Sequence, residues 1–109
     1  PLADNARKHA CQMLVDAVSD KAKDNTPAFC TGDFNATPDA PEIATTICQS
    51  GILKDAYREA AVQHGALFTF PSKKTRIDFI FVKHATVLST RTIVSSLSDH
   101  YPMVIVVEI

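Results

Sequence analysis

Three short stretches of the chain carry acidic, amide and imidazole side chains where they could do chemistry. The first is Gly32-Asp33-Phe34-Asn35, at the end of a predicted buried strand. A carboxylate and a carboxamide two residues apart can share one water or phosphoryl oxygen there, because the strand behind them is rigid. The alternative is an Asx turn that only stabilises the end of the strand. A calcium loop is excluded, since Pro38 and Ala44 replace its required glycine and glutamate.

The second stretch places Asp78 inside the apolar segment 76–82. Burying this carboxylate costs several kcal/mol unless a cation or a good donor meets it, and Arg76, two positions away, is one candidate partner. The third stretch is Ser98-Asp99-His100-Tyr101-Pro102. Its histidine can donate to a phosphoryl oxygen if a carboxylate from a neighbouring strand holds the ring, and Asp78 suits that role. The alternative is an Asp-capped turn with an exposed histidine.

The periodicity of apolar residues predicts the elements that position these side chains. Helical spacing predicts a helix from Asn5 to about Lys23 with Asp4 as its cap, and Pro41 and Gly51 bracket a second helix. Strands are predicted at 28–31, 76–82, 86–94 and 102–109, and 57–65 has weak helical character. Both faces of 76–82 are apolar, so this strand is expected to be central in its sheet.

Composition limits the class of protein. The 109 residues fit one domain, 46% are hydrophobic, and the net charge of -1 argues against a surface that binds nucleic acid everywhere. The three cysteines, Cys11, Cys30 and Cys48, are expected to be buried reduced thiols. The apolar run 103–107 is far shorter than the ~20 residues that span a bilayer. Helices interleaved with doubly covered strands predict a layered α/β fold, but two helices and about four strands cover it thinly.

In this order and spacing, the three stretches resemble the endonuclease/exonuclease/phosphatase superfamily, which includes pancreatic deoxyribonuclease. The resemblance implies a four-layered αββα sandwich, with mostly antiparallel strands in this part, that hydrolyses phosphodiesters or phosphomonoesters with Mg²⁺ or Mn²⁺. It implies that Asp33 orients and deprotonates the attacking water and that Asn35 holds this water or a phosphoryl oxygen. It further implies that Asp78 orients His100, that His100 stabilises charge on the phosphoryl group, and that Asp99 contributes to the metal site.

The family pattern also contains motifs that this chain lacks. An N-terminal asparagine, a metal-ligating glutamate and a further histidine precede the first stretch in the family, and none of these motifs occurs before Gly32. Residues 1–109 are therefore expected to be the C-terminal half of the domain, without the N-terminal half that would be its partner. We expect the isolated chain to be inactive, to bind the metal weakly or not at all, and to self-associate through uncovered apolar surface.

The sequence is compatible with several substrates and with one alternative function. Lys73, Lys74 and Arg76 lie beside Phe68 and Phe70 in the sequence, a cluster suited to phosphate or to a stacked base, or else to solvated surface. Nucleic acid, phosphoinositide and phospholipid headgroups are all compatible with it. The alternative function is a non-catalytic binding module that retains the fold without the metal-binding glutamate.

Overall fold

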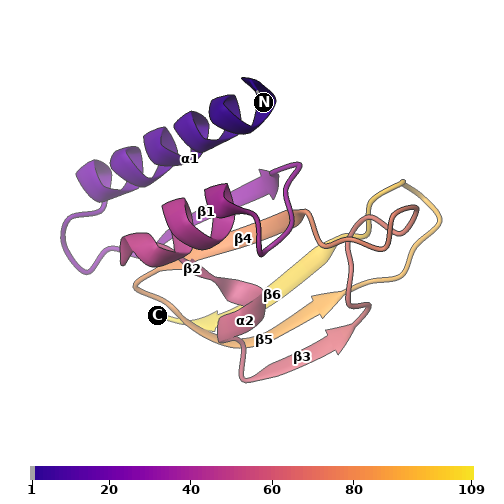
Figure 1. Cartoon of the computed structure of the whole chain (residues 1–109). Coiled ribbons are helices and arrows are strands. Elements are labelled where there is room, and N and C mark those ends of the chain that lie inside the picture. The colour runs from indigo at the N-terminus through magenta and orange to yellow at the C-terminus, as the bar shows by residue number, and fades with distance from the viewer. Residues whose placement is uncertain (1) are drawn as a thin grey trace.

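The computed structural model describes residues 2–109, in which the helices at 2–21 and 42–50 form a layer on two stacked sheets, while a short helix at 56–59 packs into the cluster between the sheets (Figure 1). The elements in chain order are α1 (Leu2–Lys21), β1 (Ala28–Asp33), the π-helix η1 (Glu42–Ile47), the 3-10 helix η2 (Cys48–Ser50), β2 (Lys54–Asp55), α2 (Ala56–Glu59), β3 (Val62–Gly65), β4 (Asp78–Lys83), β5 (Thr86–Thr92) and β6 (Met103–Glu108). Sheet A has the order β1-β4-β2 and sheet B the order β3-β5-β6. Only the β3–β5 pair is parallel, so the predicted α/β class with mostly antiparallel strands is confirmed.

Strand β4 is central in sheet A, as its doubly apolar sequence predicted. Phe79 and Phe81 point to the helical layer and are 1% and 0% exposed, packed with Ile43 and Ile47 of η1 and with one face of α1. Each fully buried side chain of this size contributes about 1.5–3 kcal/mol of hydrophobic stabilisation. On the other face of β4, Val82 belongs to the smaller cluster between the two sheets. The core therefore fixes both the position and the register of the strand that begins at Asp78.

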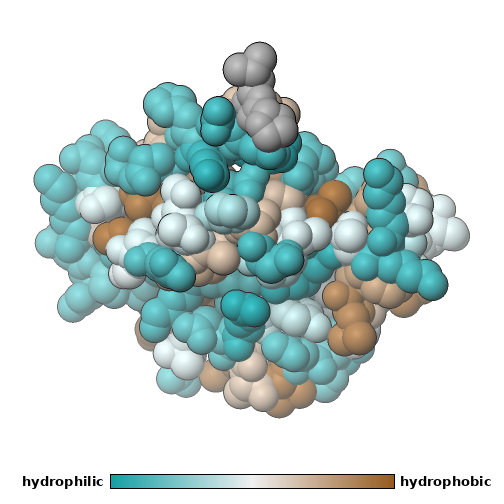
Figure 2. All heavy atoms as spheres, in the orientation of Figure 1, coloured by the Kyte–Doolittle hydropathy of each residue, from teal (hydrophilic) through white to brown (hydrophobic). Residues whose placement is uncertain are grey.

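The outer face of sheet B carries apolar side chains that residues 2–109 leave uncovered. Leu88, Val104 and Val106 are 42%, 48% and 51% exposed, and no helix of the described chain lies over them (Figure 1). The face seen in Figure 2 is different, because hydrophilic side chains predominate there and apolar ones form scattered patches. The chain thus completes three layers of a sandwich, helices on sheet A on sheet B.

Several local predictions need correction. The first helix begins at Leu2, so Asp4 lies within its first turn, where it pairs with Arg7. The segment 57–65 is mostly not helical, because α2 is a short helix that ends at Glu59 and is followed by β3. The second helix was placed correctly, and Gly51 ends it in the left-handed conformation at φ 76°.

Arg76, which the sequence suggested as a partner of Asp78, does not pair with it. Its guanidinium instead donates two hydrogen bonds to the Asp55 carboxylate, at 3.2 and 2.8 Å, with both side chains buried. The guanidinium also lies 4.3 Å from the Tyr57 ring centroid and 5.0 Å from that of Phe79. This desolvated pair links Asp55, the last residue of β2, to the segment just before β4, and it leaves Asp78 free for another partner.

Two further sequence predictions concern the cysteines and the crossing of a membrane. All three thiols are free, but only Cys11 is fully buried, while Cys30 and Cys48 are half-buried. Burial raises the pKa of each thiol above its ordinary value. Within residues 2–109, no helix combines the length and the apolar character that crossing a bilayer requires.

Candidate active site

The first two predicted stretches meet at one end of sheet A. Asp33, the last residue of β1, lies directly opposite Asp78, the first residue of β4, in the antiparallel register. The Phe34 N–H continues the pairing by donating to the Ile77 carbonyl at 2.9 Å. Two carboxylates therefore stand side by side where both strands leave the sheet, which places them at its open end rather than in its core.

Asn35 forms the turn that follows β1. It adopts the left-handed conformation at φ 50°, which asparagine tolerates better than most residues, and its N–H donates to Asp33 Oδ1 at 2.9 Å. The Asx turn considered as an alternative is thus present, and it holds the Asp33 carboxylate in place. The turn and a catalytic role for Asp33 are compatible, because only one of the two carboxylate oxygens accepts this bond.

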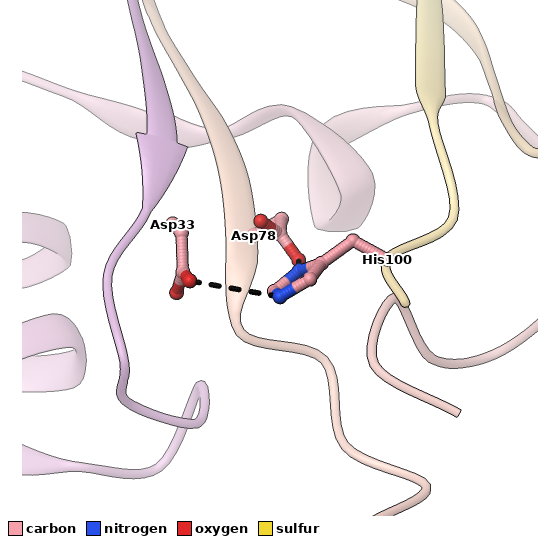
Figure 3. Close-up of side chains that lie close together, drawn as sticks. All are labelled: Asp33, Asp78 and His100. Carbon is pink, nitrogen blue, oxygen red and sulfur yellow. Dashed lines mark hydrogen bonds and ion pairs between the residues drawn. The ribbon is translucent and has the colours of Figure 1, made fainter. Parts of the chain in front are cut away.

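His100 reaches the two carboxylates from the loop before β6 (Figure 3). Its Nδ1 lies 2.7 Å from Asp78 Oδ2, and its Nε2 lies 3.8 Å from Asp33 Oδ2. An ionised carboxylate can only accept, so Nδ1 carries the proton of this bond. The 3.8 Å separation is too long for a hydrogen bond, which leaves Nε2 directed toward the space beside Asp33 and available to a third group.

The ring of His100 is held by an aromatic neighbour as well as by Asp78. The Phe70 ring lies 4.9 Å from it, centroid to centroid, at an angle of 42°. The side chains of Asp33, Asp78 and His100 are 39%, 23% and 27% exposed, so each group of the cluster is partly open to solvent. A small polar ligand can therefore reach all three groups.

Electrostatics favour the charged form of His100. The hydrogen bond to Asp78 raises the pKa of His100 above its ordinary value, with further contributions from the negative charges of Asp78, Asp33 and Asp99, while partial burial opposes the shift. The imidazolium then offsets the two neighbouring carboxylates. Its Nε2–H, which faces Asp33 Oδ2 at 3.8 Å, becomes a charge-assisted donor without a hydrogen-bond partner in the cluster.

Of the five residues predicted for the site, three come together and two do not join them. Asp33, Asp78 and His100 offer ligand atoms that all lie within 4.8 Å of one another. Asp99 lies outside this group and is exposed, with its carboxylate accepting from Ser98 Oγ at 3.3 Å. Asn35 supports Asp33 through its backbone and lines an adjoining pocket. The roles of all five remain predictions.

The adjoining pocket has a volume of about 680 Å³ and lies between the start of α1, the loop after β1 and the segment 70–77. Arg7, Lys8, Asn35, Phe70 and Lys73 are among its lining residues. The basic cluster expected from the sequence is smaller than predicted, because Arg76 is buried against Asp55 and does not contribute. The Phe68 ring stacks on Tyr101 with centroids 6.1 Å apart, and the Phe70 ring packs on His100. Both rings therefore contact the loop that carries His100.

A divalent cation fits the chemistry of this donor set, although the set is small. The carboxylates of Asp33 and Asp78 are hard oxygen donors of the kind that Mg²⁺ and Mn²⁺ prefer. His100 Nδ1 is already engaged by Asp78, which leaves two carboxylates in the described cluster as the principal ligands. Mg²⁺ requires about six ligands, so water or additional protein groups would have to complete the site.

Comparison with known proteins decides the family. The sequence model of the Endonuclease/Exonuclease/phosphatase family matches residues 1–100. The chain belongs to this family. A solved endonuclease/exonuclease/phosphatase from Bacteroides vulgatus is 30% identical with a TM-score of 0.86, and the match covers 96% of this chain and 44% of that chain.

Two further solved structures share the fold. A mannosyl-6-phosphatase from Bacteroides thetaiotaomicron is 22% identical with a TM-score of 0.83, covering 96% of this chain and 46% of that one. A conserved protein of unknown function from Enterococcus faecalis is 23% identical with a TM-score of 0.74, covering 96% and 45%. None of the curated proteins is significantly similar in sequence. The chain therefore spans less than half the length of each of these three solved structures.

The contact between Asp78 and His100 makes a prediction about pH. A histidine whose pKa is raised by folding contributes stability that is fully present below its unfolded pKa of about 6.5 and is lost as the pH rises through the folded value. Asp78→Asn is expected to lower the His100 pKa and to destabilise the chain more at pH 5.5 than at pH 9. NMR titration of the imidazole and urea unfolding at both pH values measure this. Asp24→Asn, which removes an exposed carboxylate near the start of β1, serves as the control, and an unchanged His100 titration in Asp78→Asn would refute the prediction.

Proposed function

We propose that this chain is the C-terminal half of a divalent-metal-dependent phosphoesterase that hydrolyses phosphodiester or phosphomonoester bonds with an activated water. The observation that supports this most is the convergence of three separated stretches on one cluster, with His100 Nδ1 2.7 Å from Asp78 and Nε2 facing Asp33. Membership of the endonuclease/exonuclease/phosphatase family supports hydrolysis as the reaction type.

In the proposed reaction, Asp33 accepts a proton from a water that attacks phosphorus. Its second carboxylate oxygen, Oδ2, does not accept the bond from the Asn35 N–H and lies 3.8 Å from His100 Nε2, and Asn35 binds the same water or a phosphoryl oxygen from the adjoining turn. His100, held by Asp78, donates its Nε2–H to a phosphoryl oxygen and stabilises the negative charge that develops there. The P–O bond to the ester oxygen breaks opposite the water, this oxygen takes up a proton from solvent, and Asp33 releases its proton to solvent.

The metal ion belongs to the same proposal. When bound, a divalent cation polarises the phosphoryl group and neutralises part of its charge. Asp99 is the residue proposed to contribute to its site, directly or through water, beside the carboxylates of the cluster. Mg²⁺ is the proposed ion, with Mn²⁺ as a substitute, since both prefer oxygen ligands.

The pocket next to the cluster is the proposed place for the part of the substrate that does not react. Its volume of about 680 Å³ can hold a sugar or a nucleoside, and Lys8 and Lys73 on its rim favour an anionic one. A sugar phosphate deserves a place among the trial substrates, since one structural neighbour is a mannosyl-6-phosphatase. Phosphodiesters of nucleic acid, phosphoinositides and phospholipid headgroups complete the set.

Loss of the proposed base or charge stabiliser should abolish most of the activity of the complete protein. Asp33→Asn and His100→Gln are each expected to lower kcat by roughly 10² to 10⁴, the usual contribution of such groups. Steady-state kinetics on a panel of phosphomonoesters and phosphodiesters measures this. Asp24→Asn and His64→Gln, which change the same residue types at exposed positions outside the cluster, should retain full activity. Unchanged turnover in both site variants would contradict the proposal, and a complete protein that binds a phosphoester without hydrolysing it would favour the non-catalytic binding module.

The small donor set makes a prediction for the metal. Residues 1–109 alone are expected to bind Mg²⁺ weakly or not at all and to have no useful activity, because two clustered carboxylates do not satisfy a hard cation. Isothermal titration of the chain with Mg²⁺, repeated on Asp33→Asn, tests this. Micromolar binding that Asp33→Asn removes would show that the chain already contains a sufficient site.

The uncovered face of sheet B makes a prediction for association. We propose that isolated chains self-associate through Leu88, Val104 and Val106, since apolar groups this exposed favour burial against another surface. Sedimentation velocity should show dimers or larger species that Val104→Lys with Val106→Lys reduces. Val94→Lys adds a charge at a 70% exposed valine outside the strands and should change nothing. A monomer at every concentration would contradict the proposal.

A further inference from the structure

One buried threonine contacts two of the three segments that build the candidate active site. Thr69 lies in the loop between β3 and β4 and is 0% exposed. Its hydroxyl oxygen accepts hydrogen bonds from the N–H groups of Ile77 and Asp78, both at 3.1 Å. Its carbonyl accepts from the Tyr101 N–H at 2.7 Å. One residue therefore binds the start of β4, where Asp78 stands, and the peptide that follows His100.

The backbone connects the third segment to the same point. Ile77, whose N–H is held by the Thr69 hydroxyl, accepts at its carbonyl from the Phe34 N–H at 2.9 Å. Phe34 directly follows Asp33. Asp78 and Tyr101, the residue after His100, are each joined to Thr69 by one hydrogen bond. The segment of Asp33 is joined to Thr69 indirectly, because Phe34 bonds to Ile77 and Ile77 bonds to Thr69.

The neighbours of Thr69 act on the same loop. Phe68 stacks on Tyr101 at 6.1 Å and Phe70 packs on His100 at 4.9 Å. Residues 68–70 therefore hold His100 and Tyr101 in place through two ring contacts and one backbone hydrogen bond. The segment itself is fixed, because the Thr69 and Phe70 N–H groups both donate to the Thr75 carbonyl, at 3.0 and 2.9 Å.

We propose that Thr69 is a positioning residue of this site, whose hydroxyl and carbonyl hold Asp78 and His100 at the separation that lets their side chains meet. The hydroxyl is the decisive group, because its oxygen satisfies two backbone donors that strand pairing leaves free at the beginning of β4. Without it, these N–H groups must find other partners and the start of the strand shifts. In its consequence for catalysis, the inference rests on the proposed phosphoesterase function.

The chain provides a matched control for the loss of this hydroxyl. Thr90 on β5 is 1% exposed, and its hydroxyl has no hydrogen-bond partner within residues 2–109. Thr69→Val and Thr90→Val make the same change of shape and polarity at equally buried positions. Only the first removes hydrogen bonds. Thr69→Ser keeps the hydroxyl and serves as the rescue variant.

The test has a spectroscopic part that needs no activity. In residues 1–109, the ¹⁵N shifts of neutral His100 show which ring nitrogen carries the proton, and the wild type should hold it on Nδ1, facing Asp78. Thr69→Val should give a mixture with the Nε2–H tautomer, while Thr69→Ser and Thr90→Val should keep Nδ1–H. A folded Thr69→Val with an unchanged tautomer would overturn the proposal, and so would a Thr69→Ser that behaves like valine.

A second measurement uses the wild type alone, in case Thr69→Val does not fold. Amide hydrogen exchange should show the Asp78 and Tyr101 amides protected and opening together, because both depend on Thr69. Independent exchange of the two amides would overturn the proposal. In the complete protein, Thr69→Val should lower kcat by roughly 10- to 100-fold with a smaller change in KM, as a misplaced catalytic group does. A wild type inactive on every phosphoester would refute the proposed function and leave the two NMR results to decide the role of Thr69.

Discussion

The candidate site depends on two carboxylates that the sheet forces together. Asp33 and Asp78 face each other across β1 and β4, and like charges directly opposed in a sheet are destabilising. His100 reduces this repulsion, since its ring binds Asp78 and faces Asp33. The hydrogen bond to Asp78 and the nearby negative charges raise the pKa of His100. The same contacts leave the Nε2–H of this ring facing Asp33 at 3.8 Å, without a hydrogen-bond partner. The contact of His100 with the two carboxylates therefore both stabilises this cluster and positions its ring nitrogen.

The register that opposes the carboxylates is set far from them, in the hydrophobic core. Phe81 pairs with Cys30 and faces the helical layer, while Val82 pairs with Phe29 and faces sheet B. A slip of one residue would exchange the two faces of β4, expelling Phe79 and Phe81 from the core and moving Asp78 away from Asp33. The buried Arg76–Asp55 pair reinforces this register at the start of the strand. The geometry of the candidate site is thus a consequence of apolar packing along β4.

The parts of the fold that the sequence predicted are those whose signal is local. The helical spacing of α1, the bracketing of η1 by Pro41 and Gly51, and the doubly apolar β4 all follow from neighbouring residues. Strand β3 was missed because its four residues are exposed and have no apolar periodicity. It exists through its parallel pairing with β5, where Gly65 allows a backbone approach so close that a Cβ would lie 2.0 Å from the Thr92 carbonyl oxygen. The partner of Arg76 was unpredictable for the same reason, since Asp55 lies 21 residues away and is brought near only by tertiary structure.

The site shows the same division between local and tertiary information. Asp33, Asp78 and His100 were recognisable because their residue types follow or interrupt apolar strands, and the structure brings them together. The supporting contacts of residues 68–70 carry no such mark, because an aromatic–threonine–aromatic sequence in a loop has no period and no charge. The hydrogen bonds of Thr69 and the Asp78–His100 contact hold these charged groups relative to one another, whereas the outer face of sheet B is left open. The described residues therefore fix the geometry of the candidate site more firmly than they cover sheet B, and the two clustered carboxylates are fewer than the oxygen ligands that a hard cation requires.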